Sequence, residues 1–154
     1  MKKQLVISLL VACALVFTGS VIYAGTKVAD EFEMKSPEYK KHKKVIVKFT
    51  HKKHHDEYGA ACGECHHDDK GKPLDLKMGD DVQRCIECHK TPGEKPKKKK
   101  GEKKAPKLTK AQKLEYHAEA LHMNCKDCHK KFNKKNKTKA APTTCTKCHP
   151  KTKK

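Results

Sequence analysis

The chain has little of the material from which an ordinary protein core is built. Its 154 residues include no Trp, four Phe and four Tyr, and hydrophobic residues make up only 35% of the total. Part of that share lies in one N-terminal apolar segment, while charged residues reach 36%. A chain of this composition buries too little apolar side-chain area to offset the entropy that folding costs. Side chains alone therefore do not account for a stable core.

Acidic residues are also scarce relative to basic ones. Lys and Arg number 37 against 18 Asp and Glu, which gives a formal net charge of +19. Basic chains often bind nucleic acid, but this one carries no nucleic-acid-binding motif and begins with a pattern typical of export. We therefore expect no nucleic-acid partner. Acidic protein surfaces are the expected complement, with at most peripheral contact with anionic lipid headgroups.

The N-terminus has the pattern of a signal peptide. Met1-Lys2-Lys3 is positively charged, residues 5–17 are apolar apart from Ser8, and Ala24 precedes Gly25 at a suitable cleavage point. We predict a signal peptide at residues 1–24 and one domain at residues 25–154. An uncleaved anchor and lipid attachment at Cys13 are the alternatives.

Cysteine is not scarce, and eight of the nine cysteines form one repeated motif. In each copy two cysteines stand three positions apart and a histidine follows directly, which is the spacing of covalent c-type haem attachment. The sulfurs bind the porphyrin, and the histidine becomes the proximal ligand of the iron. Zinc-type or redox CxxC pairs would not need a histidine after every copy, and exported thiols tend to be oxidised. The four copies are Cys62, Cys65 and His66; Cys85, Cys88 and His89; Cys125, Cys128 and His129; and Cys145, Cys148 and His149.

The remaining histidines are numerous enough to cap every iron a second time. Eleven histidines occur in the chain, and four of them belong to the motifs. An iron with two imidazole ligands has no open position and suits low-potential electron transfer. Capping by a methionine is the competing interpretation. The seven spare histidines are His42, His51, His54, His55, His67, His117 and His122, and the candidate methionines are Met34, Met78 and Met123.

Regular structure is expected to be sparse. Alternating apolar residues predict a short strand at residues 45–49. Thr109 and Gln112 form a capping-box pattern, which predicts a helix from there to about Met123. The Lys-rich segment 96–107 and the basic segment 130–144 are both expected to be loops. The predicted fold is mostly irregular and α-helical with a short N-terminal β element, organised around four covalently bound haems that supply the core.

The segment around the first haem motif resembles a known family. The run Val47-Lys48-Phe49-Thr50-His51-Lys52-Lys53-His54, followed by Cys62-Gly63-Glu64-Cys65-His66-His67, is similar to the N-terminal half of the class III c-type cytochromes, the tetrahaem cytochrome c3 type. The resemblance covers residues 37–150 and is specific over residues 47–67. All four motifs here are CxxCH, whereas many members use a longer cysteine spacing at haems 2 and 4. The Lys-rich segment after haem 2 is also unusual.

The resemblance implies a set of distal ligands. It assigns His51 to haem 1, His67 to haem 2 and His54 to haem 3, while His55 is left as a surface residue. Haem 4 would take a histidine that precedes the third motif, and two are present. We favour His122, which stands three residues before Cys125, and keep His117 as the alternative.

The resemblance also implies a function. It indicates a periplasmic, monomeric electron carrier of anaerobic, sulfate-type respiration, and not an enzyme. Its expected partners are acidic redox proteins, namely periplasmic hydrogenase, formate dehydrogenase and transmembrane cytochrome complexes. The alternative function is a small multihaem reductase of metal ions or nitrogen oxides. Such an enzyme would need an iron with an open sixth position, which the surplus of histidines argues against.

Overall fold

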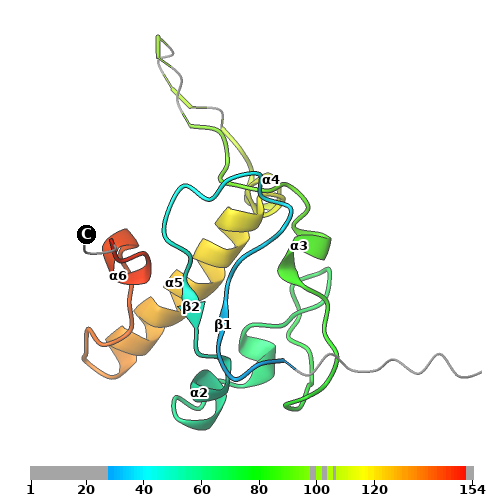
Figure 1. Cartoon of the computed structure of the whole chain (residues 1–154), viewed down its shortest axis with the longest axis vertical. Coiled ribbons are helices and arrows are strands. Elements are labelled where there is room, and N and C mark those ends of the chain that lie inside the picture. The colour runs from blue at the N-terminus through cyan, green and yellow to red at the C-terminus, as the bar shows by residue number, and fades with distance from the viewer. Residues whose placement is uncertain (1–27, 98–99, 102–103, 106, 152–154) are drawn as a thin grey trace, which may run out of the picture.

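The computed structural model describes residues 28–97, 100–101, 104–105 and 107–151. The predicted signal peptide and parts of the Lys-rich segment 96–107 lie outside these residues. The described part is a small, mostly helical and irregular structure with one short sheet (Figure 1). Its elements are β1 (Phe32–Glu33), β2 (Lys48–Phe49), α2 (His51–Asp56), η1 (Cys62–Glu64), α3 (Cys85–Cys88), α4 (Lys110–Leu114), α5 (His117–Lys135) and α6 (Cys145–Cys148).

The sheet joins two segments that flank a polar turn. β1 and β2 pair antiparallel, with Phe32 opposite Phe49 and Glu33 opposite Lys48. The two Phe rings meet edge to face at a centroid distance of 5.5 Å, a favourable geometry for an aromatic cross-strand pair. The strand predicted at residues 45–49 is therefore present but limited to its last two residues. Its partner β1 was not predicted, because two residues give no readable alternation.

The predicted helix at residues 109–123 is present in two pieces. The capping box is confirmed, since Thr109 Oγ1 accepts the Gln112 N–H at 3.2 Å and the Gln112 side chain accepts the Thr109 N–H at 3.0 Å. The first piece, α4, ends at Leu114 because Thr91 forms a parallel bridge with Tyr116 and accepts the His117 N–H at 2.8 Å. Contacts with a distant segment therefore interrupt the helix.

The second piece corrects the loop predicted at residues 130–144. Helix α5 runs on to Lys135, 19 residues in all. No Gly or Pro interrupts the sequence before Pro142, Lys is a good helix former, and Lys134 and Lys135 complement the dipole at the helix C-terminus. Only residues 136–144 are irregular. Helices α3 and α4 both pack against α5, which makes it the central element of the structure.

Side chains form almost no core. Among the described residues the buried hydrophobic side chains are Ile86 and Ala120, each 7% exposed, and the buried polar ones are Ser36 and His117. Larger apolar side chains remain exposed, including Tyr58 at 50% and Met78 at 41%. The sparse core agrees with the composition. Within the described ranges we find no helix long and apolar enough to cross a membrane.

Candidate haem-binding site

The four cysteine motifs occupy single helical turns. The first is the 3-10 turn η1, the second and fourth are the four-residue helices α3 and α6, and the third lies within α5. In the three short turns the histidine N–H donates back to the carbonyl of the first cysteine, at 2.9 Å for His66, 2.9 Å for His89 and 2.8 Å for His149. Residues three apart in a helical turn share one face. Each motif therefore presents its two sulfurs on the same side.

Burial favours the protonated form of five of the eight motif thiols. Burial, together with neighbouring thiols, raises the pKa of Cys65 and of Cys125 to about 11. Burial also raises the pKa of Cys85, Cys128 and Cys148. A protonated thiol is a poor nucleophile toward disulfides. The eight motif cysteines form no disulfide within the part of the chain that the structure describes.

Each motif histidine faces one spare histidine. The ring centroids of His66 and His51 lie 6.4 Å apart, and those of His89 and His67 lie 6.0 Å apart. The rings of His129 and His54 lie 6.2 Å apart, and those of His149 and His122 lie 6.3 Å apart. The four pairs use eight different histidines, and each pair joins segments that are distant in the sequence.

This spacing fits a metal ion held between two imidazoles. A transition metal binds an imidazole nitrogen at about 2.0–2.1 Å, so two such ligands on opposite sides of one ion keep their ring centroids about 6.3–6.5 Å apart. The four observed distances span 6.0–6.4 Å. Aromatic rings in simple edge or face contact would also fall between about 4.5 and 7 Å. The narrow range and the one-to-one pairing favour ligation over incidental contact.

Hydrogen bonds leave the far nitrogen of most of these rings available. The Nδ1 atoms of His129 and His149 bond the carbonyl oxygens of Pro142 and Val45, both at 2.7 Å, and His89 Nδ1 bonds that of Leu114. His54 and His67 do the same with Thr50 at 2.8 Å and Asp68 at 2.7 Å. A carbonyl oxygen only accepts, so each Nδ1 carries the proton and each Nε2 has a free lone pair. Metal-binding histidines are oriented by this kind of bond.

Burial keeps two further rings neutral. It lowers the pKa of His66, with smaller contributions from His51 and His67, and it lowers the pKa of His122. A neutral imidazole is the form that binds a metal ion. The donor set of eight thiols and eight imidazoles therefore fits four covalently attached, doubly capped haems.

Two helices carry ligand candidates for more than one pair. His51 and His54 stand one turn apart on α2, yet His51 faces the first motif and His54 faces the third. Phe49 lies beside both rings, at centroid distances of 5.9 Å and 4.6 Å. On α5, His122 stands three residues before the third motif, yet it faces His149 of the fourth. These two helices therefore tie three of the four pairs together, and the pair of His67 and His89 adjoins them because His67 follows His66 in the sequence.

The other histidines are engaged elsewhere. His55 is exposed, and its Nδ1 lies 2.7 Å from the carboxylate of Asp56. His117 is buried at 7% exposure, and its Nδ1 is bonded to the Tyr39 hydroxyl at 3.0 Å. The ring of His42 stacks on that of Tyr39, at a centroid distance of 5.0 Å. The structure thus brings His54 rather than His55 to the third motif, and His122 rather than His117 to the fourth.

Some supporting groups leave no trace in the sequence. The carbonyls that orient the motif histidines belong to Val45, Leu114 and Pro142, and every residue has a carbonyl. Tyr39 also escaped notice, because a single tyrosine in a polar segment carries no pattern. Asn133 bridges residue 141 with both side-chain ends, at 2.9 Å and 3.1 Å, and so shapes the turn that positions Pro142.

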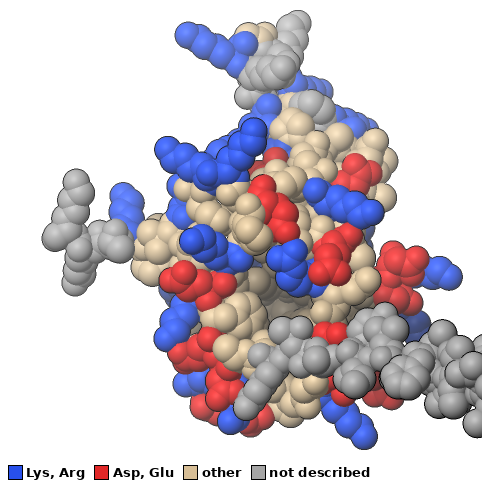
Figure 2. All heavy atoms as spheres, turned by 45° about the vertical axis from the view of Figure 1, so that its right-hand side comes forward, with Lys and Arg blue, Asp and Glu red and all other residues tan. Residues whose placement is uncertain are grey.

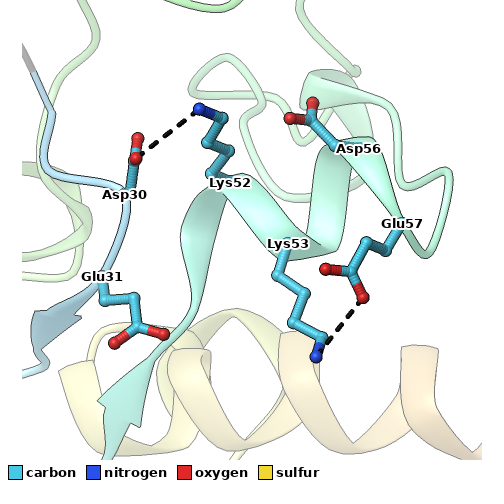
Figure 3. Close-up of a pocket in the computed structure, with 6 residues that line it drawn as sticks. All are labelled: Asp30, Glu31, Lys52, Lys53, Asp56 and Glu57. Atoms are coloured by element: carbon cyan, nitrogen blue, oxygen red, sulfur yellow. Dashed lines mark ion pairs between the residues drawn. The ribbon is translucent and has the colours of Figure 1, made fainter.

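A hollow of about 360 Å³ lies away from these histidines (Figure 3). Its lining is entirely charged, and its lysines are paired, Lys52 with Asp30 at 3.6 Å and Lys53 with Glu57 at 3.3 Å. None of the motif cysteines or paired histidines lines it. We assign it no function. Its lining residues are Asp30, Glu31, Lys52, Lys53, Asp56 and Glu57.

Comparison with known proteins agrees with this donor set. The model of the class III cytochrome c family matches residues 29–149. A curated relative described as cytochrome c3, from Maridesulfovibrio salexigens, is 33% identical over 122 residues, which cover 78% of this chain and 92% of the relative. No solved structure matches. The chain belongs to the class III cytochrome c family, whose members bind c-type haem and transfer electrons. The family resemblance predicted from the sequence is thus confirmed.

Proposed function

We propose that this chain is a periplasmic, low-potential tetrahaem electron carrier in which every iron is capped by two histidines. The observation that carries the proposal is the pairing of each motif histidine with one different spare histidine at 6.0–6.4 Å. The sparse side-chain core of the described residues supports the proposal independently, because four porphyrins would supply the missing apolar core.

The assignment of residues follows the pairs. When bound, haem supplies a one-electron ferric–ferrous couple. The motif cysteines hold the porphyrins covalently, and the motif histidines bind from the proximal side. The carbonyls of Val45, Leu114 and Pro142 fix the ring orientation and the tautomer of three of them. The distal ligands are His51 for haem 1, His67 for haem 2, His54 for haem 3 and His122 for haem 4.

Full capping defines what the site does chemically. If haem is bound at these pairs, the two imidazoles of each pair would leave no iron position for a substrate, and imidazole favours the ferric state more than methionine does. Electron transfer without bond making is the chemistry that remains. The expected partners are acidic redox proteins such as hydrogenase and formate dehydrogenase, together with transmembrane cytochrome complexes.

A haem count tests the proposal. Protein expressed with its N-terminal segment in a host that attaches haem outside the cytoplasm should give four haems per chain in a pyridine haemochrome assay. Its intact mass should equal the mass of the processed chain plus that of four haems. The double variant Cys145→Ser, Cys148→Ser should carry three. A wild-type protein with fewer than four haems, or with haem that an acidic organic solvent extracts, would overturn the tetrahaem assignment.

A further inference from the structure

Two segments of the chain carry opposite charge. Residues 56–88 contain nine acidic and four basic residues, a net charge of −5, although the whole chain is strongly basic. Residues 126–151 contain nine lysines and one acidic residue, a net charge of +8. The first range surrounds the first two haem motifs, and the second surrounds the last two.

Much of each charged region lies on a different side of the molecule, although the two regions meet where Glu64 lies 3.9 Å from Cys128. In Figure 1 the C-terminal half of α5 and α6 form one side, and α3 with the loop before it forms the other. Figure 2, which brings the α3 side of the molecule forward, shows carboxylates in the middle and lower parts of this face with Lys and Arg side chains among them. Charges separated in this way steer an approaching molecule into a preferred orientation.

Within each charged region, one surface forms no ion pair among the described residues. Among the described residues the ion pairs involve the N-terminal strand, α2, Arg84, the segment around Lys95 and the middle of α5. The acidic loop, defined as residues 68–81, has five carboxylates and three lysines, a net charge of −2, and none of its carboxylates is in an ion pair within the described structure. The lysine face is likewise unpaired there, and it is defined by the exposed residues Lys131, Lys134, Lys135, Lys137, Lys139 and Lys147.

Hydrogen bonds hold the acidic loop in a fixed shape, and part of the lysine face lies on helix α5. Asp68 accepts the N–H groups of Lys70 and Lys72 at 2.9 Å and 2.8 Å, and Asp80 accepts that of Lys77 at 2.7 Å. The lysines at positions 131 and 135 stand one turn apart on α5, where like charges cost stability. A surface that is already ordered loses less entropy when it binds a partner.

We propose that the lysine face of one molecule docks on the acidic loop of a second copy of this chain. The occupant follows from charge complementarity, because the chain itself carries both an exposed group of lysines and a hydrogen-bonded loop with five carboxylates. The contact is head to tail, with different surfaces on the two copies. It brings the last two haem motifs of one molecule to the first two of the next, and so it rests on the proposed function for its redox consequence.

Electron exchange between copies is that consequence. One electron leaves a reduced copy, where one iron goes from ferrous to ferric, and enters an oxidised copy, where one iron goes from ferric to ferrous. No proton or further reductant is needed. The encounter is transient, as is usual for small redox interfaces, because two molecules of net positive charge also repel each other overall.

Zero-length carbodiimide cross-linking of equal amounts of ¹⁴N- and ¹⁵N-labelled holoprotein tests the contact. Mixed-isotope peptides should join the acidic loop to the lysine face. Asp69→Asn, Asp75→Asn, Asp81→Asn should lower their yield at least about fivefold at 10 mM ionic strength, where the Debye length is about 30 Å. The matched control Asp30→Asn, Glu31→Gln, Glu33→Gln changes the net charge equally and should lower it less than about twofold.

Charge exchange makes the test independent of any loss of folding. The variant Asp69→Lys, Asp75→Lys, Asp81→Lys should stop cross-linking to itself, and mixing it with Lys134→Glu, Lys137→Glu, Lys139→Glu should restore mixed dimers. Equal loss in the matched control, or no restoration on mixing, would overturn the proposal. Cross-linking without electron self-exchange in NMR exchange spectra would support the docking surface and refute the electron exchange between copies. The haem count tests the proposed function separately from both results.

Discussion

At the scale of single residues, the hydrogen-bond partner of Nδ1 distinguishes most of the proposed ligands from the histidines that face no motif. Five of the paired rings bond a main-chain carbonyl through Nδ1, namely His54, His67, His89, His129 and His149. By contrast, His55 and His117 bond side chains, a carboxylate and a tyrosine hydroxyl. Main-chain acceptors fix the tautomer that frees Nε2. The sequence shows which histidines exist, but only the folded chain shows which ring is held this way.

His54→Ala should open one iron of the four. The ring of His54 faces His129 at 6.2 Å, so its loss leaves haem 3 without a distal ligand. About one quarter of the haem should become high-spin in the ferric protein and bind carbon monoxide in the ferrous protein. His55→Ala, which alters the neighbouring exposed ring, is the control and should keep all four haems low-spin. Equal spectra for the two variants would refute the assignment.

His122→Ala and His117→Ala should differ in the same way. The first removes the ring opposite His149 and should open haem 4. The second removes a buried ring bonded to Tyr39, so it should lower stability and leave four low-spin haems. Optical spectra of the ferric proteins and thermal unfolding of both variants check the prediction. A high-spin haem in His117→Ala would exchange the two roles.

At the scale of elements, the strengths of local patterns decide what could be predicted. The capping box at Thr109 was readable because it is complete within four residues. The interruption after Leu114 was not, since it depends on a bridge between Thr91 and Tyr116, 25 residues apart. The predicted helix ended well before the end of α5, because the lysine-rich segment after it was interpreted as a solvated loop although lysine is a good helix former. Strand β1 is two residues long and exists only through its pairing with β2.

The contact between Glu38 and Arg84 should make the stability of the protein depend on pH. The hydrogen bonds of Glu38 with Ser36 and its own backbone, together with the Arg84 guanidinium at 2.6 Å, lower the pKa of this carboxyl from 4.5 to about 2. A depressed folded-state pKa contributes stability above pH 4.5, and that contribution is lost as the pH falls toward 2. Glu38→Gln should therefore unfold at lower denaturant than wild type at pH 7, and the difference should shrink between pH 4.5 and 2.

Glu33→Gln is the control for that experiment. It removes the same charge from an exposed position in β1 that makes no ion pair among the described residues. Its unfolding midpoint should differ little from that of wild type at pH 7. A difference for Glu38→Gln that stays constant from pH 7 to pH 2 would show that the carboxylate's charge does not matter.

At the scale of the whole molecule, net charge hides a strong asymmetry. The composition predicted a basic protein, and the four motifs predicted a core made of haem rather than of side chains. The arrangement of one acidic and one basic side could not be predicted, because it needs the path of the chain around α5. The pairs of distal and proximal histidines likewise depend on contacts such as that of His149 with Val45, 104 residues apart.

Electron transfer to an acidic redox partner should depend on the lysine face. Lys134→Gln, Lys137→Gln, Lys139→Gln should slow the second-order reduction by an acidic hydrogenase several-fold at low salt, because electrostatic steering sets such rates. Lys35→Gln, Lys40→Gln, Lys41→Gln removes the same charge elsewhere and should have a smaller effect. The wild-type rate should fall steeply toward 0.15 M salt, where the Debye length is about 8 Å. Variants of the acidic loop should not slow this reaction. Stopped-flow kinetics measures the rates of wild type and of each variant.

The central claim is that every iron is held by two histidines, and binding of carbon monoxide tests it most directly. The fully reduced native protein, titrated with carbon monoxide at pH 7 without denaturant, should keep low-spin ferrous spectra and bind less than about 0.1 equivalent per chain. The same sample in strong denaturant should bind it readily at all four haems, which proves that the irons are reactive once released. Stoichiometric binding by the native protein would reveal an open iron and contradict the account.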